Sequence, residues 1–445
     1  MQADNETGLN IFQRLARRWE AVHPYNAAQV LRISGRVAAS HASDAWAQSL
    51  RHLGLGRVRL LDQSRFCHDV LNGEFQRYPL RVLPPGESLD AHLTAELNRP
   101  FDRPDEPPFR PFLLPGDGEF YFGVVYQHWV ADSVSIRAVL REWFTRIFDP
   151  GAARSSPLRT SSRGYAELFG KRGNWRFDET LLSNFRSHIR HRRVRKVQTH
   201  GRADYPVRVS LHSTPDGLID RLRALARAQG VKVHDVLLAA MAEACSRFVP
   251  HQPRRNRPDL SIGSIVDLRP HACADLSSTF GLFLGFTQVV LRPSVIQDWD
   301  RLLHCVAAQN RVHKQSGLPQ ASMLWMAAAL AVNPWVPDRN LYHFYRKEMP
   351  TAGGLSNVNL NGAWAAAYSP EPLREYLRVS PTGPLAPLVV STTTLGSKLS
   401  IALTCRDALL PPGQSAVMIN AVLERLSGLA TGRRGDELSC PKLPY

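Results

Sequence analysis

The order of apolar and polar positions in the first part of the chain predicts alternating helices and strands. "NIFQRLARRWEAV" and "DAWAQSLRHLG" place apolar residues at helical spacing, and Gly54 ends the second helix. "QVLRISGRV", "RVRLLD" and "FYFGVVYQHW" predict strands, the first because its apolar and polar residues alternate. From Ser133 to Phe148 the apolar residues gather on one helical face, so we expect an amphipathic helix there, ended by residues 149–151.

The second half of the chain also mixes the two periodicities. "YPVRVSL" predicts a strand, and "STPDGLIDRLRALARAQG" predicts a helix with Ser213 or Thr214 as N-cap, Pro215 in its first turn and Gly230 as C-cap. "VHDVLLAAMAEACSRFV" is apolar nearly all round and predicts a buried helix. Further strands are expected in "LSIGSIVDLRP", "FTQVVLRP", "GLSNVNL", "PLAPLVVSTTTL" and "KLSIALTC", and a last helix in "QSAVMINAVLERLSGLA". The predicted class is therefore α/β or α+β, with two lobes of similar size, residues 1–195 and 196–445.

Composition narrows the class of protein. The chain has 445 residues, of which 44% are hydrophobic and 21% charged, as in an ordinary globular enzyme. The most apolar run, residues 323–332, is too short to span a membrane, and the first residues lack the pattern of a signal peptide. The six cysteines form no CxxC pair, so we expect reduced thiols in the cytoplasm and neither a disulfide framework nor a metal site.

Charge points to an anionic partner. Lys and Arg outnumber Asp and Glu by 55 to 39, which gives a net charge of +16. The densest basic stretch, "RSHIRHRRVRK" at residues 186–196, contains no acidic residue. It has no interleaved aromatic residues and no recognisable nucleic-acid motif, so binding of nucleic acid is not favoured. A solvated basic connector between the lobes and a docking surface for an acidic partner both remain open.

One short stretch carries candidate chemistry. In "YQHWVADSVS", His128 lies four residues before Asp132, between a predicted strand and a predicted helix. A neutral imidazole is suited to removing a proton near neutral pH. The HxxxD spacing also recurs by chance, so the motif alone leaves a structural histidine as an alternative. Walker A, GxGxxG, GxSxG and HExxH motifs are absent, and the "GGLS" that ends at Ser356 lies in a strand-like run instead of the helix start of a carrier domain.

Longer segments resemble a known superfamily, in the same order along nearly the whole chain. They are "HPYNAAQVLRISGRV", "PFRPFLLPGDGEFYFGVVYQHWVADSVS", "RLRALARAQGVKVHDVLLAAMAEACSRF", "IVDLRP" with "TFGLFLGFTQVVLRP", "LSNVNL" and "VVSTTTLGSKLSIALTC". Together they resemble chloramphenicol acetyltransferase, non-ribosomal peptide condensation domains, BAHD acyltransferases and wax ester synthases. A DFGWG motif is absent, so a plant-type BAHD enzyme is not expected.

The resemblance implies two chloramphenicol-acetyltransferase-like lobes in a V, with the active site at their interface. His128 would be the general base, and Asp132 would turn away from the substrate to pair with Arg269, unless Arg269 is an exposed charge at a strand end. Gln127 replaces the first His of the family's HHxxxDG motif, and Ser133 replaces its Gly. We expect Ser133 to narrow the approach to His128 or to restrict the dihedral angles of the loop.

The resemblance also implies a reaction. A free-standing enzyme of natural-product biosynthesis would move an acyl group from a phosphopantetheine thioester, on coenzyme A or a carrier protein, to an alcohol or amine. Backbone N–H groups after the motif, or the Ser133 hydroxyl, would stabilise the oxyanion. No bound cofactor, metal or membrane is expected. The alternative is a degenerate condensation-like protein that only binds a carrier, with Gln127 and Ser133 as marks of lost catalysis.

Overall fold

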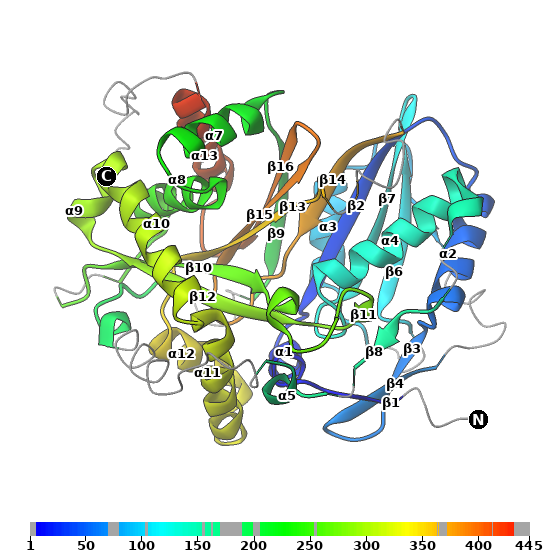
Figure 1. The fold of residues 1–445 in the computed structure, drawn as a ribbon, viewed down its shortest axis with the longest axis horizontal. Helices are drawn as coiled ribbons and strands as arrows, with labels where there is room; N and C mark the ends of the chain where they lie inside the picture. The colour runs from blue at the N-terminus through cyan, green and yellow to red at the C-terminus, as the bar shows by residue number, and fades with distance from the viewer. Residues whose placement is uncertain are drawn as a thin grey trace.

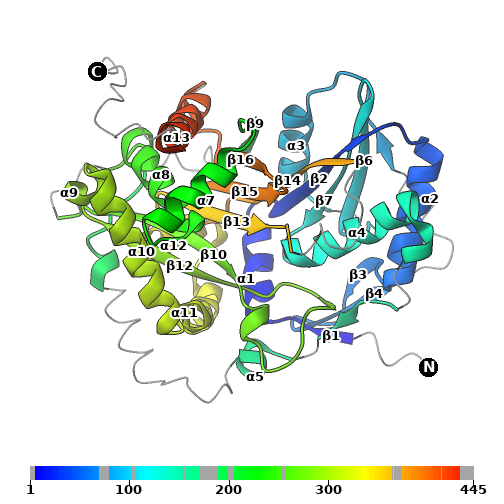
Figure 2. The ribbon, with the colours of Figure 1, turned by 45° about the horizontal axis from the view of Figure 1, so that its top comes forward.

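The computed structural model places two larger sheets next to each other, each covered by its own helices (Figure 1). It describes residues 6–69, 80–102, 106–153, 156–161, 163–169, 189–198, 205–252, 256–362, 364, 372–411 and 413–430. In the turned view, α7, α8, α10 and α13 stay on one side of the molecule and α2 stays at the opposite side (Figure 2). The chain is therefore two-lobed, in agreement with the predicted fold class.

The N-terminal lobe is built on a five-stranded sheet. Its order is β14 (Leu373–Val379), β2 (Asn26–Ser34), β7 (Glu119–Gln127), β6 (Phe109–Pro115) and β5 (Arg81–Val82), and only the β5–β6 pair is parallel. Helices α2 (Ala39–Leu53) and α4 (Ser133–Phe148) cover one face, and α3 (Leu89–Asn98) covers the other. Because strand residues alternate between faces, Leu31 and Ile33 pack on the first side while Ala28 and Val30 pack against Leu93 of α3.

The C-terminal lobe is built on a six-stranded mixed sheet. Its order is β12 (Leu284–Leu291), β10 (Leu260–Asp267), β13 (Gly353–Asn359), β15 (Leu388–Leu395), β16 (Lys398–Arg406) and β9 (Val207–Ser213). Strand β13 is parallel to both of its neighbours, and the other pairs are antiparallel. Helices α7 (Leu218–Ala228), α8 (Val233–Phe248), α10 (Trp299–Gln315) and α13 (Gln414–Ala430) pack on it, and α8 is buried nearly all round as its sequence predicts.

Shorter elements complete the described chain. Two small sheets pair β1 (Glu6–Gly8) with β4 (Arg65–Asp69) and β3 (Arg57–Leu60), and β8 (Arg159–Thr160) with β11 (Thr279–Phe280). The remaining helices are α1 (Ile11–Glu20), α5 (Tyr165–Phe169), α9 (Pro293–Ile296), α11 (Leu318–Val332), α12 (Asp338–Glu348) and the 3₁₀ turns Pro150–Ala152, Arg269–His271 and Asn333–Trp335. Within the described ranges, no helix is both long enough and apolar enough to cross a membrane.

Two segments from late in the chain reach the N-terminal lobe. Strand β14 is an edge strand of the N-terminal sheet, although it lies between β13 and β15 in sequence. Strand β11 pairs in parallel with β8, so the loop before β12 crosses to the lobe that carries α4. These crossovers bring late residues to the motif of His128, whereas the lobe boundary at residues 195 and 196 stays a prediction.

The start of α7 differs from the expected one. Ser213 ends strand β9, and the Thr214 hydroxyl donates a hydrogen bond to the Leu399 carbonyl oxygen at 2.6 Å. The chain therefore stays with the sheet past the expected N-cap, and α7 begins only after Gly217, which has φ +70°. Gly230, with φ +65°, follows the C-cap by one residue.

Candidate functional site

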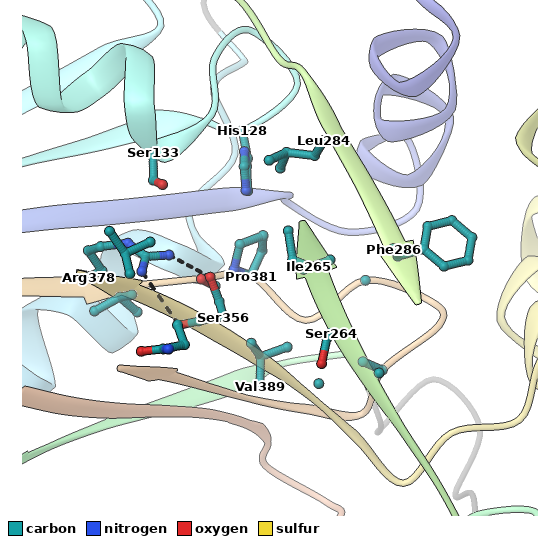
Figure 3. Close-up of a pocket in the computed structure, with 18 of the residues that line it drawn as sticks. His128, Ser133, Ser264, Ile265, Leu284, Phe286, Ser356, Arg378, Pro381 and Val389 are labelled. Atoms are coloured by element: carbon teal, nitrogen blue, oxygen red, sulfur yellow. Dashed lines mark hydrogen bonds between the residues drawn. The ribbon is translucent and has the colours of Figure 1, made fainter. Parts of the chain in front are cut away.

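A cavity of about 430 Å³ lies between the two sheets. One wall comes from β2, the end of β7 and the start of α4, and the other comes from β10, β12, β13 and β15. Figure 3 shows His128, Ser133 and Arg378 facing Ser264, Ile265 and Val389 across this space. The cavity is thus lined by both lobes, and His128 is one of its lining residues.

His128 is held rigidly in one orientation. It follows the end of β7, where its backbone N–H donates to the Tyr25 carbonyl oxygen at 3.0 Å. Its ring stacks on the Tyr25 ring with centroids 5.4 Å apart, and its side chain is 9% exposed. Nδ1 lies 2.9 Å from the Ala131 carbonyl oxygen, which can only accept, so Nδ1 carries the hydrogen. Nε2 therefore keeps its lone pair.

Burial favours the neutral form of the His128 imidazole. The pKa of His128 is lowered from its ordinary value because burial disfavours the imidazolium. The hydrogen bond to Ala131 and the charge of Asp132 act in the opposite direction, and Arg378 adds to the lowering. A neutral imidazole with a fixed tautomer is the form that a general base requires.

Asp132 faces away from the cavity and fixes the loop. It is fully buried and caps α4, because its Oδ1 accepts from the N–H groups of Val134 and Ser135, each at 3.0 Å. Its Oδ2 accepts from Arg269 Nη1 at 2.6 Å and from the Phe283 N–H at 2.9 Å. Burial opposes ionisation, but Arg269 and these hydrogen bonds outweigh it, so the pKa of Asp132 lies below its ordinary value.

Arg269 ties the crossing loop to α4. It opens the 3₁₀ turn that follows β10 and is 9% exposed, and its Nη2 donates to Ser135 Oγ at 3.0 Å. The Ser135 hydroxyl in turn donates to the Gly281 carbonyl oxygen at 2.8 Å. Arg269 also lies over the Phe283 ring, with 4.7 Å from the guanidinium carbon to the ring centroid. The structure therefore brings Asp132 and Arg269 together in a buried network, and Arg269 is not an exposed charge at a strand end.

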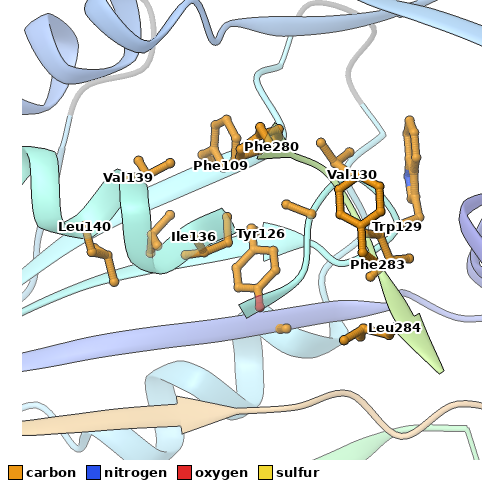
Figure 4. Close-up of a cluster of buried hydrophobic side chains, with 14 of the residues drawn as sticks. Phe109, Tyr126, Trp129, Val130, Ile136, Val139, Leu140, Phe280, Phe283 and Leu284 are labelled. Atoms are coloured by element: carbon orange, nitrogen blue, oxygen red, sulfur yellow. The ribbon is translucent and has the colours of Figure 1, made fainter. Parts of the chain in front are cut away.

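An apolar cluster surrounds this network. Side chains of α4, of the loop after His128 and of the segment around β11 and β12 pack together, as Figure 4 shows for Phe109, Tyr126, Trp129, Val130, Ile136, Val139, Leu140, Phe280, Phe283 and Leu284. All ten are buried. The cluster keeps water from the Asp132–Arg269 pair, which strengthens the pair and raises the cost of breaking it.

Ser133 is accommodated without backbone strain. It is the first residue of α4, and among the described residues none other than glycine has a positive φ. The position after Asp132 adopts an ordinary helical conformation, so a serine fits there as well as a glycine. Ser133 does line the cavity next to His128, and its hydroxyl has no hydrogen-bond partner in the described part of the chain.

The loop leaves fewer oxyanion donors than expected. The N–H groups of Val134 and Ser135 are already used by Asp132, so these two backbone groups are not free to bind an oxyanion. Ser133 remains as a hydroxyl donor at the cavity surface. The cap of α4 therefore removes the N–H groups of Val134 and Ser135 from the expected donors and leaves those of Ser133.

Gln127 contacts the end of α1 and is not among the residues that line the cavity. Its Nε2 donates to Glu20 Oε1 at 3.3 Å, and its backbone N–H donates to the Pro108 carbonyl oxygen at 3.1 Å. Burial raises the pKa of Glu20 to about 7, against the hydrogen bonds from Gln127 and Trp129 and the charge of Arg17. Gln127 thus has a structural position behind His128.

Only residues 189–196 of the basic stretch lie within the described part of the chain. Arg190, Arg192 and Arg193 are exposed, whereas Arg195 is half-buried and its Nε donates to the Pro258 carbonyl oxygen at 2.8 Å. Arg193 lies 3.4 Å from a carboxylate oxygen of Asp259. The segment is therefore packed against the C-terminal lobe and is not a freely solvated connector.

Two cavity residues were not identified as site residues from the sequence. Arg378 lies in β14 and Ser356 in β13, and the Arg378 Nη2 donates to Ser356 Oγ at 2.5 Å (Figure 3). Ser356 belongs to the "GGLS" stretch, which forms a strand as expected. No local motif marks Arg378, because only the crossover of β14 brings it to the cavity.

Solved structures share this architecture over nearly the whole chain. The first condensation domain of the calcium-dependent antibiotic synthetase, solved with a substrate analogue, is 16% identical with a TM-score of 0.66, covering 96% of this chain and 97% of that chain. The cyclization–docking bidomain of the non-ribosomal peptide synthetase EpoB from Sorangium cellulosum is 13% identical with a TM-score of 0.66, covering 96% and 85%.

A trichothecene 15-O-acetyltransferase, TRI3 from Fusarium sporotrichioides, is 10% identical with a TM-score of 0.66, covering 95% of this chain and 94% of that chain. No protein-family model matches the sequence, and no curated protein sequence matches it. The chain therefore has the two-lobed, chloramphenicol-acetyltransferase-like fold of condensation domains.

Proposed function

We propose that the protein is a condensation-like acyltransferase with His128 as its general base. It moves an acyl group from a phosphopantetheine thioester to an alcohol or amine, in natural-product biosynthesis. The observation that carries this proposal is the geometry of His128, whose Nδ1–H bond to Ala131 leaves Nε2 as a base at a cavity between the lobes. The likeness to condensation domains and an acetyltransferase supports the same chemistry.

The reaction follows from these positions. Nε2 of His128 takes the proton of the acceptor hydroxyl or amine as the acceptor attacks the thioester carbonyl carbon. The Ser133 hydroxyl donates to the resulting oxyanion. When the intermediate collapses, the carbon–sulfur bond breaks, the sulfur leaves with the proton from His128, and the ester or amide is released. Asp132 and Arg269 hold the loop and touch no reacting atom.

Product formation tests this proposal. Wild-type protein is incubated with acyl-coenzyme A, acyl-carrier or acyl-pantetheine donors and a panel of amines and alcohols, and intact masses are recorded. We expect an acceptor to gain the mass of the acyl group with loss of one hydrogen. A carrier-binding protein without catalysis would instead retain carrier affinity and give no product with any donor.

The lowered pKa of His128 predicts the acid limb of the pH profile. Only the neutral imidazole acts as a base, so a lowered pKa keeps the enzyme active to more acidic pH than an ordinary histidine with a pKa of about 6.5 allows. We therefore expect kcat/KM to fall with a midpoint below that value as pH decreases. A midpoint at or above it, in a protein that stays folded over the range, would contradict the assignment.

The exposed part of the basic stretch predicts how a carrier-bound donor arrives. Carrier proteins are usually acidic, so charge reversal at Arg190 and Arg192 should slow association about tenfold at low salt. Arg193 and Arg195 are left unchanged because they contact Asp259 and Pro258. Transfer from a short pantetheine thioester should hardly change.

The matched control reverses two exposed arginines elsewhere, Arg36→Glu with Arg227→Glu, so that net charge changes equally. We expect the docking variant alone to lose transfer from the carrier, and wild-type transfer to decline as salt shortens the Debye length below about 10 Å. Equal loss with the carrier and the pantetheine donor would mean damage to the lobe, and equal loss in both variants would mean only a net-charge effect.

A further inference from the structure

Arg378 places a buried positive charge in the same cavity as His128. It lies in β14, the strand that crosses from the C-terminal half of the sequence to the N-terminal sheet. Its side chain is 5% exposed and lines the cavity, where Figure 3 shows the guanidinium next to Ser356. Burial lowers the pKa of Arg378 to about 10, so it remains charged at neutral pH.

The protein does not neutralise this charge in the way it neutralises Arg269. Nη2 donates to Ser356 Oγ at 2.5 Å, and Nη1 lies 3.5 Å from the Ser356 carbonyl oxygen and 3.4 Å from that of Thr392. A guanidinium has five N–H groups, so two remain without a partner among the described residues. Within that part of the chain no carboxylate lies within 4.0 Å, whereas Arg269 is paired with Asp132.

The other charged groups that line the cavity do not balance the positive charge of Arg378. Arg137 also lines the cavity. Asp267 is a carboxylate that lines the cavity, but it lies 3.4 Å from Arg269. Arg269 does not line the cavity, so part of the negative charge of Asp267 is already balanced outside it. Burying an arginine without a counter-ion is costly, which favours a counter-ion supplied by the ligand.

We propose that Arg378 is the anion subsite of this cavity and binds a carboxylate of one of the two substrates. Arginine is suited to this group because its planar N–H groups match the two carboxylate oxygens. The Ser356 hydroxyl accepts from Arg378 and has its own hydrogen to donate to the same group. The inference rests on the proposed function, since it names the substrate class of that site.

Binding measured without turnover tests the subsite. Candidate amines and alcohols are titrated in matched pairs, each as the free carboxylic acid and as its primary amide, against wild-type protein, Arg378→Gln and Arg374→Gln. Arg374 lies on the same strand but is exposed, so its variant controls for changes to β14. We expect at least one acid to bind wild type and Arg374→Gln about 10- to 100-fold more tightly than its amide, and Arg378→Gln to lose this difference.

A second arm identifies the part of the substrate that carries the carboxylate. Succinyl-pantetheine and its neutral analogue succinamoyl-pantetheine are titrated in the same way. A preference for the succinyl donor that depends on Arg378 would place the carboxylate on the acyl group, and the same preference among the amines and alcohols would place it on the acceptor. Equal binding of every acid and amide, or an acid preference that persists in Arg378→Gln, would overturn the subsite and make Arg378 a clamp between β14 and β13. Because no transfer is needed, this result is independent of whether His128 catalyses it.

Discussion

Replacement of His128 by alanine is expected to slow acyl transfer by about 10²–10⁴-fold, because the acceptor then loses its proton without a positioned base. Donor binding and the thermal unfolding midpoint should change little, since the ring contributes one side-chain hydrogen bond, to the Ala131 carbonyl. Single-turnover rates with a pantetheine donor measure the effect. His304→Ala, at an exposed position on α10, is the matched control and should retain wild-type rates.

The outcome that contradicts this prediction is clear-cut. If His128→Ala keeps at least half of the wild-type rate, His128 is not the base. If it loses donor binding together with turnover, its main contribution is to the shape of the cavity, through its contacts with Tyr25.

Loss of either partner of the buried ion pair is expected to destabilise the protein by roughly 3–5 kcal/mol. Asp132→Ala removes the buried carboxylate from Arg269, which keeps only the more exposed Asp267 at 3.4 Å, and also removes the cap of α4. Arg269→Ala leaves the Asp132 carboxylate buried with only backbone donors. Each variant leaves a buried charge without its buried counter-ion, so the two losses have the same cause.

A double-mutant cycle of denaturant unfolding measures the pair. The double variant should be less destabilised than the sum of the single variants, because it removes both charges at once. Arg32→Ala with Glu119→Ala, a partly exposed pair between β2 and β7, is the matched comparison and should show weak coupling. Additive effects at Asp132 and Arg269 would show that the pair does not act as a unit.

Local periodicity was enough to predict the elements that carry the motif. The apolar stripe from Ser133 to Phe148 and the run before His128 correspond to α4 and β7. The partner of Asp132 is 137 residues away, and only resemblance to a family pointed to Arg269. Spacing alone contains no such information, because the contact depends on how the lobes meet.

Strand β14 was missed because its pattern is not that of a half-buried strand. Glu375 and Arg378 lie on opposite faces of β14 and are both buried, 4% and 5% exposed, whereas a half-buried strand exposes the polar residues of one face. Glu375 is satisfied by the Ser400 hydroxyl at 2.7 Å, and the register shifts between Leu373 and Glu375. Buried polar residues therefore concealed the strand that brings Arg378 to the cavity.

The cap of α4 also bears on which groups can donate hydrogen bonds to the oxyanion, a point that the sequence left open. Asp132 precedes α4 directly, so its side chain takes the N–H groups of Val134 and Ser135. From the motif alone, the same N–H groups were equally good donors for a substrate. Only the orientation of Asp132 toward Arg269 separates these alternatives.

Chemical rescue by imidazole tests the central claim most directly. The His128→Ala variant leaves room in the cavity for a free imidazole, whose neutral form supplies the missing base. We predict that single-turnover transfer by this variant rises with imidazole concentration and follows the neutral fraction of imidazole as pH changes, while the wild-type rate stays constant. A loss of activity that imidazole leaves unchanged at every pH would contradict the role of His128 as the general base.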